Sequence, residues 1–272
     1  MPNIRYIILS IAILATVGLY FLPRVVVENE PAQTASVSDV SGGGEEVTDM
    51  HSTDIPEEQA AHMNEHKALF REATSEAQKL EQLTELMDEF KSFNLYDSAA
   101  IYAGQFANEY PSLANSILAG DAYFDAFSFA MSKEKTDKLG VKVREYYQRA
   151  LEIEPNEDLE VKIGVTYVSG DNPMQGILKI REVLGKNPEN KLAIYNLGML
   201  SMQSGQFDRA VERFEKLIEL EPENTQAHFY LGVSYLETGS EQKALERFEH
   251  VKAVETNPQV LQSVEAYIKE IK

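Results

Sequence analysis

Two histidines one helical turn apart offer the clearest potential for chemistry in this 272-residue chain. His62 and His66 stand at positions i and i+4, so a helix would place both imidazoles on one face. Glu58 and Glu65 lie nearby in the sequence. This spacing suits a zinc site, but such sites take three or four protein ligands and the sequence indicates no third one. We therefore favour a solvated polar helix face and expect no metal.

No other group of residues predicts catalysis. The chain has no cysteine, which excludes disulfides, thiol nucleophiles and zinc–cysteine sites. The glycine run at 42–44 lacks the apolar helix and the Lys-Ser/Thr pair that follow a phosphate-binding loop. His228 stands at a core-packing position, where we expect a partly buried, hydrogen-bonded side chain. We expect the chain to be no enzyme and to hold no cofactor.

Acidic residues dominate the composition. They outnumber Lys and Arg by 44 to 25, which gives a net charge of −19. Phosphate contacts need clustered basic side chains, so this balance argues against nucleic acid as a partner. Residues 25–55 combine acid with Ser, Thr and Gly and have few large apolar side chains. Such a segment buries too little surface to offset its ordering entropy, which predicts a disordered acidic linker.

The N-terminal residues 1–24 are predicted to form a transmembrane anchor. Residues 6–22 are an uncharged apolar run of 17 residues, which as a helix spans about 26 Å. Arg5 and Arg24 flank it, and the slight excess of positive charge before it predicts that the N-terminus is inside. The remainder would then face the periplasm from the cytoplasmic (inner) membrane of a bacterium. A cleaved signal peptide is the alternative, but its apolar region is normally shorter, about 7–15 residues.

Small, aromatic and proline residues recur at an interval of 34 in the C-terminal half. The first set is Ile194, Leu197, Gly198, Gly205, Ala210, Phe214 and Pro222, and the second is His228, Leu231, Gly232, Tyr235, Gly239, Ala244 and Phe248. Parts of the pattern extend back to Ile163, Gly164, Gly176, Ile180 and Pro188. This pattern resembles the tetratricopeptide repeat. The resemblance implies an all-α fold, an α-solenoid of helix-turn-helix repeats, and a role in protein binding.

Each position of the repeat has an expected physical role. Gly198 and Gly232 are expected inside the first helix of a pair, where a side chain would block the neighbouring helix. Gly205 and Gly239 are expected to end that helix with left-handed backbone. The remaining positions are expected at helix crossings and in the core between repeats, and they are Ala210, Ala244, Phe214 and Phe248.

About five repeats fit the pattern. Their predicted intervals are 80–112, 113–157, 158–190, 191–224 and 225–258, and residues 259–272 are predicted to be a C-terminal capping helix. The second repeat carries about ten extra residues at 132–140, which we expect to lengthen its turn.

Residues 56–79 are predicted to form an N-terminal helix before the repeats. Apolar residues recur there at spacings of three and four, and Ser75 with Gln78 has the spacing of a capping box that would split the helix in two. This helix either covers the first repeat or forms a coiled coil that makes a homodimer.

The first helix of each pair lines the concave face of such a solenoid. Residues beside its packing stripe predict a protein-binding groove, formed by Lys162, Val165, Tyr195, Asn196, Met199, Met202, Phe229, Tyr230 and Val233. Methionines and aromatics suit a recognition surface. The alternative is that Tyr195, Met199, Phe229 and Tyr230 pack between repeats or beneath the final helix.

The leading prediction is a membrane-anchored module that binds a partner protein, or an extended or helical segment of one, in this groove. The alternative is a dimeric structural scaffold of the cell envelope that assembles through residues 57–79 and has no peptide groove.

Overall fold

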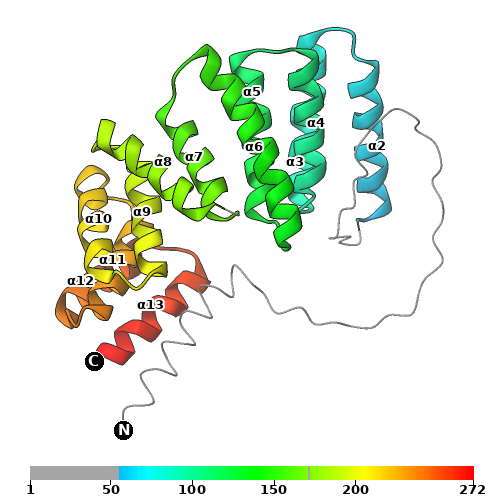
Figure 1. Ribbon diagram of the computed structural model, residues 1–272. Helices are drawn as coiled ribbons and strands as arrows, with labels where there is room; N and C mark the ends of the chain where they lie inside the picture. The colour runs from blue at the N-terminus through cyan, green and yellow to red at the C-terminus, as the bar shows by residue number, and fades with distance from the viewer. Residues whose placement is uncertain (1–54, 171) are drawn as a thin grey trace. The chain divides into compact units, whose positions relative to one another are not determined.

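The computed structural model describes residues 55–170 and 172–272, and every regular element within these ranges is an α-helix (Figure 1). The predicted anchor, and all but the last residue of the predicted linker, lie outside the described residues. Among the described helices, none combines the length and the apolar character needed to cross a lipid bilayer. The all-α prediction is confirmed for the part of the chain that the structure describes.

The helices follow one another in antiparallel pairs. In chain order they are α2 (Glu57–Glu72), α3 (Glu76–Ser92), α4 (Tyr96–Glu109), α5 (Leu113–Ser128), α6 (Lys133–Ile153), α7 (Glu157–Val168), α8 (Pro173–Lys186), α9 (Lys191–Gln203), α10 (Phe207–Leu220), α11 (Thr225–Glu237), α12 (Glu241–Val254) and α13 (Pro258–Ile271). Each helix packs mainly on its neighbours in sequence, and α7 also contacts α9. The pairs α3–α4, α5–α6, α7–α8, α9–α10 and α11–α12 are the units that the 34-residue pattern describes.

The prediction of one helix over residues 56–79 is wrong, because the chain breaks between α2 and α3. Ser75 is the N-cap of α3, and its hydroxyl oxygen accepts a hydrogen bond from the backbone N–H of Gln78 at 3.3 Å. A capped serine satisfies a backbone donor that a helix start leaves unpaired. The capping-box alternative therefore describes this region correctly, and α3 belongs to the first helix pair.

The extra residues at 132–140 do not lengthen a turn, contrary to the prediction. They form the first turns of α6, which Ser132 caps by accepting from the N–H of Lys135 at 3.3 Å. The ion pair between Lys133 and Asp137 joins side chains one turn apart and supports a helix here. Gly140 lies buried within this helix, so it does not mark a loop.

The glycines of the 34-residue pattern lie where the pattern predicts. A methyl group on Gly198 would lie 2.8 Å from the Phe214 ring, and one on Gly232 would lie 2.8 Å from the Phe248 ring. Only glycine permits this approach of the two helices. Gly205 and Gly239 end α9 and α11 with φ of +69° and +77°, as expected for left-handed helix ends. Four other pattern positions are fully buried, and they are Ala210, Ala244, Phe214 and Phe248.

The apolar core consists of three clusters in succession along the chain. The first extends from Met63 on α2 to Ile163 on α7. A small cluster of buried side chains then joins α7, α8 and α9. The third extends from α9 to α13 and includes Val264 and Ile268 of the final helix. Because α13 buries these two side chains against α11 and α12, it covers the last helix pair, as a capping helix does.

Candidate functional site

The predicted groove residues lie on the first helices of three successive pairs, α7, α9 and α11. All of them are half-buried, neither sealed in the core nor fully exposed, and they are Lys162, Val165, Tyr195, Asn196, Met199, Met202, Phe229, Tyr230 and Val233. The repeat brings equivalent positions of adjacent pairs together. The structure therefore places the predicted residues on one series of neighbouring helices.

Aromatic side chains join α9 to α11. The ring centroids of Tyr195 and Tyr230 are 6.2 Å apart, and the Phe214 ring stacks on Tyr230 with centroids 5.7 Å apart. Tyr195 also meets the edge of Phe214. Part of each tyrosine thus packs on the core while the remainder stays accessible, as in a side chain that anchors a partner.

Phe229 is the groove residue that packs most clearly beneath the capping helix. Its ring lies 6.1 Å from Tyr267 of α13, and Tyr267 stacks on Phe248 at 4.9 Å. Burial raises the pKa of the Tyr267 phenol to about 12. Phe229 therefore packs beneath the final helix, as the alternative interpretation predicts. Only the uncovered part of its ring is available for binding.

Apolar side chains on either side of the tyrosines extend this surface. Met199 and Met202 of α9 and Val233 of α11 are half-buried against the same apolar cluster. Methionine has a flexible, polarisable side chain that adapts to partners of different shape. We call the set Tyr195, Met199, Met202, Phe229, Tyr230 and Val233 the α9–α11 face.

The polar groove residues are occupied by contacts within the chain. The Lys162 ammonium lies 2.6 Å from the Asp121 carboxylate of α5 and also faces the Tyr147 ring. The Asn196 amide donates to the Leu192 carbonyl at 2.8 Å. Val165 packs against two of the apolar clusters. The α7 end of the predicted groove is therefore committed to internal contacts.

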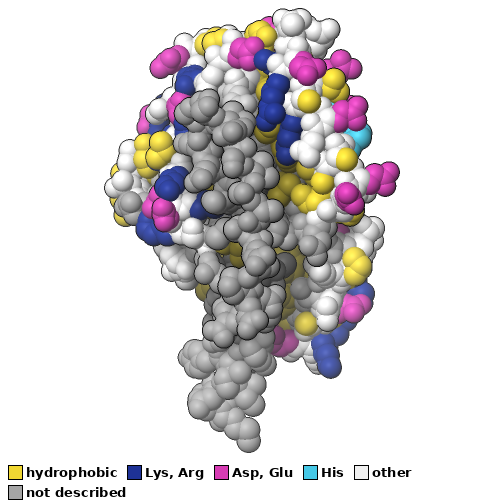
Figure 2. All heavy atoms as spheres, turned by 90° about the vertical axis from the view of Figure 1, so that its right-hand side faces the viewer, with side chains coloured by type: hydrophobic (Ala, Val, Ile, Leu, Met, Phe, Trp, Pro, Cys, Tyr) yellow, Lys and Arg dark blue, Asp and Glu magenta, His cyan; other side chains and the backbone are white. Residues whose placement is uncertain are grey.

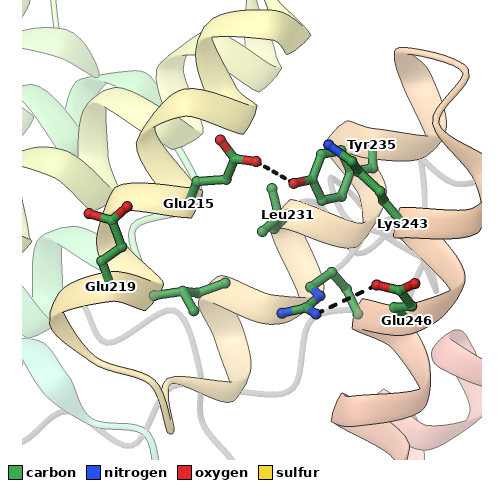
Figure 3. A pocket seen from close by; sticks show the side chains of 8 residues that line it. Glu215, Glu219, Leu231, Tyr235, Lys243 and Glu246 are labelled. Atoms are coloured by element: carbon green, nitrogen blue, oxygen red, sulfur yellow. Dashed lines mark hydrogen bonds and ion pairs between the residues drawn. The ribbon is translucent and has the colours of Figure 1, made fainter.

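Sequence reasoning did not identify a pocket of about 510 Å³ among α10, α11 and α12 (Figure 3). The Tyr235 hydroxyl donates to the Glu215 carboxylate there, and burial raises the pKa of Tyr235 to about 12. Arg247 pairs with Glu246 at 3.9 Å. Tyr235 belongs to the 34-residue pattern, but its partners come from two other helices, which the pattern does not predict. The Lys243 ammonium lies over the Tyr235 ring, and Glu219 pairs with Lys216 of α10.

A third potential ligand lies beside the histidine pair of α2. His62 and His66 lie on α2, and Glu89 of α3 lies beside them as a third possible metal ligand. His228 behaves as expected, since it is buried and its ring Nε2 bonds the Pro222 carbonyl at 2.9 Å.

Comparisons with known proteins agree with the repeat. Residues 195–258 match the family model described as tetratricopeptide repeat. No curated protein sequence matches the chain. A solved tetratricopeptide repeat protein from Parabacteroides merdae shares 16% identity over 78% of this chain and 79% of its own length, with a TM-score of 0.53. That likeness concerns the fold.

Two further solved structures match less well in shape. The protein MamA is 18% identical, with 63% of this chain and 88% of MamA covered and a TM-score of 0.43. YrrB, described as a tetratricopeptide repeat protein with an unusual peptide-binding site, is 16% identical, with 77% and 97% covered and a TM-score of 0.42. The family match thus identifies residues 195–258 as tetratricopeptide repeats, and the helix pairs before them continue the same architecture.

Proposed function

We propose that this chain binds a segment of a partner protein on the α9–α11 face and carries out no chemistry of its own. The observation that carries the proposal is the half-buried state of Tyr195 and Tyr230, which contact each other across two successive repeats. Each ring is held in place by core packing on one side. A partner would thus find anchors that lose little conformational freedom on binding.

The chemistry of this face indicates the chemistry of the bound segment. It consists of aromatic side chains, methionines and valine, and the nearest cation predicted for the groove, Lys162, is paired with Asp121. A partner with an acidic terminus would meet no free cation from the predicted groove residues. We therefore propose an apolar segment, extended or helical, as the ligand.

We further propose that residues 1–24 anchor the chain in the cytoplasmic membrane, with the helices on the outer side. The apolar run at 6–22 and its flanking arginines support this proposal. The acidic linker at 25–55 would let the helices search the space near the membrane. Tethering raises the local concentration of the binding face, so a weak partner contact would suffice there.

The double variant Tyr195→Ala with Tyr230→Ala tests the binding proposal. Partner recovery in a pull-down from detergent-solubilised membranes is expected to fall at least tenfold, because both anchors are lost. Phe129→Ala is the matched control, since this ring is 58% exposed and follows α5, away from the α9–α11 face. Equal recovery by the double variant and the control, with both folded by circular dichroism, would refute the proposal.

A homodimeric scaffold remains the second proposal, and one observation favours it. Leu69 of α2 and Leu80 of α3 are 41% and 38% exposed, so α2 does not cover all the apolar surface near it. The variant Leu69→Glu with Leu80→Glu would break a dimer formed there. Analytical ultracentrifugation of the full chain in detergent would show this as loss of the dimer, and a wild-type monomer would exclude the scaffold.

A further inference from the structure

His62, His66 and Glu89 form a cluster of three potential metal ligands at the start of the described chain. One ligand atom from each residue lies within 4.8 Å of the others. The two histidines share a face of α2, and Glu89 comes from α3, 27 residues after His62. Figure 2 views the molecule from the side of α2 and shows histidine at the surface near acidic side chains.

Only one of the two carboxylate oxygens of Glu89 has a hydrogen-bond partner among the described residues. One of its carboxylate oxygens pairs with the ring Nδ1 of His62, while the other, Oε2, is buried and makes no hydrogen bond to any described residue. A buried acceptor without a partner is costly, and such groups are rare in folded proteins. A cation bound at this carboxylate would satisfy it.

Gln82 orients His66 as the outer partner of a metal ligand would. The His66 Nδ1 lies 3.0 Å from the Gln82 side-chain oxygen, which can only accept a hydrogen bond, so Nδ1 carries the proton. The lone pair of His66 then resides on Nε2. Metal-binding histidines commonly donate their other ring N–H to a carbonyl or carboxylate in this way.

The ligand set selects the class of ion. Two imidazoles and one carboxylate suit Zn²⁺ and neighbouring divalent transition metals, with bond lengths of about 2.0–2.2 Å. Tetrahedral ligands at that distance lie about 3.4 Å from one another, so small side-chain rotations would close the cluster. His62 is largely exposed, which leaves the fourth position to water. The nearby Glu65 and Glu85 add negative charge that favours a cation.

The other histidine pair in the described residues also has a buried nitrogen without a hydrogen-bond partner, Nε2 of His250, but it belongs to no group of three potential ligands. His228 and His250 have ring centroids 4.0 Å apart, but the Nε2 of His228 already bonds a backbone carbonyl. Arg247 lies 3.5 Å from the Nδ1 of His228 and would repel a metal ion. This pair therefore serves as an internal control.

We propose that His62, His66 and Glu89 bind one divalent transition-metal ion, with Zn²⁺ as the reference ion, and that the ion fastens α2 to α3. Within α2 only Met63 and Phe70 are buried, so the helix has few apolar contacts of its own. Two ligands from α2 and one from α3 would add a direct link between the helices.

Zinc titration of the full chain in detergent, followed by calorimetry, tests the proposal. We expect one Zn²⁺ per chain, and an affinity that falls at least tenfold in Glu89→Gln and in His66→Ala, while His250→Gln binds as the wild type does. Glu89→Gln keeps the size of the side chain, so it separates loss of a ligand from loss of the fold. Absence of binding at about 100 μM free zinc, or unchanged affinity in Glu89→Gln, would overturn the proposal.

The orienting role of Gln82 and the link between helices have separate readouts. Gln82→Ala is expected to weaken zinc binding about tenfold, in the range measured for outer partners of metal ligands. Hydrogen exchange of the α2 amides is expected to slow when zinc is added to the wild type and to stay unchanged in Glu89→Gln. Equal α2 exchange with and without zinc in the wild type would refute the link.

Discussion

The pair α5–α6 and the two pairs α9–α10 and α11–α12 place an aromatic ring against a glycine of the first helix, but they use different rings. In the later pairs Phe214 and Phe248 pack on Gly198 and Gly232, with the same spacing of 16 residues in each case. In α5–α6 the ring against Gly120 is Tyr147, which comes 27 residues later on the extended helix α6.

This difference in one hydroxyl changes how the two regions are held together. A buried phenylalanine needs only complementary shape, whereas a buried tyrosine needs a hydrogen-bond acceptor. Tyr147 donates to Asp121 at 2.7 Å, and Asp121 also pairs with Lys162 of α7. The polar network thus uses Lys162, a residue of the predicted groove. The rings at the equivalent sites of the regular region, Phe214 and Phe248, need no such acceptor.

Removing a ring from the regular region has the largest expected effect. Phe214→Ala empties a fully buried site, and we expect the free energy of unfolding to fall by about 3–5 kcal/mol. Urea unfolding of the full chain in detergent, followed by circular dichroism, measures the change. Phe129→Ala is the control, with an expected loss of only about 0.5–1.5 kcal/mol, because the ring is mostly exposed and its stacking on Tyr96 is lost. A loss below about 1 kcal/mol for Phe214→Ala would contradict the packing described here.

Exchanging the two kinds of ring tests the comparison itself. Tyr147→Phe removes the hydrogen bond to Asp121, and we expect a loss of about 1.5–3 kcal/mol. Phe214→Tyr brings a hydroxyl against Gly198 at a dry site, and we expect a loss of about 1–3 kcal/mol. The same urea unfolding measures both. If Tyr147→Phe proved neutral, the polar network would not distinguish the two regions.

A smaller effect is expected at the left-handed end of α9. Gly205→Ala forces a methyl-bearing residue to φ near +69°, which is expected to cost about 1–2 kcal/mol. Gly185→Ala is the matched control, because Gly185 lies in α8 with nothing within 4 Å of an added methyl group. The control should gain about 0.5–1 kcal/mol from a better helix former. Thermal unfolding that moves both variants in the same direction would contradict the assignment.

The smallest expected effect concerns pH. Burial, with help from the nearby Glu270, raises the pKa of the Glu237 carboxyl. The folded chain therefore holds this proton more tightly than the unfolded chain, so stability is lost as pH rises from about 4.5, the ordinary value, through the folded pKa. Glu237→Gln removes this penalty, and the expected gain at pH 7 is below about 1 kcal/mol because solvent screens the group. The gain should shrink at pH 4, and a gain independent of pH would exclude this cause.

The sequence predicts the regular region well because its determinants are local and repeated. Gly205 and Gly239 mark helix ends, and the 16-residue spacing from Gly198 to Phe214 fixes a helix crossing. Such features are visible in any window of one repeat. The 34-residue period therefore specifies both the helix pairs and which side chains their crossings bury.

The sequence fails where a distant residue decides the structure. The extra residues of the second repeat are predicted to lengthen a turn, yet Gly140 is buried in α6, where an added methyl group would lie 3.5 Å from Phe127 of α5. Glu89 was not recognised as a ligand because it joins His62 and His66 only when α2 folds back on α3. The ion pair of Lys162 was likewise not predicted, because its partner Asp121 lies on a different helix, α5.

Photo-crosslinking from the α9–α11 face tests the proposed function most directly. A benzoylphenylalanine in place of Met199, in membranes containing the full chain, is expected to form an adduct with one defined polypeptide. The account predicts that this adduct disappears when Tyr195→Ala and Tyr230→Ala are added, and that the same probe in place of Phe129 does not form it. An adduct that persists in the triple variant, or that forms equally from position 129, would contradict a binding face on α9 and α11.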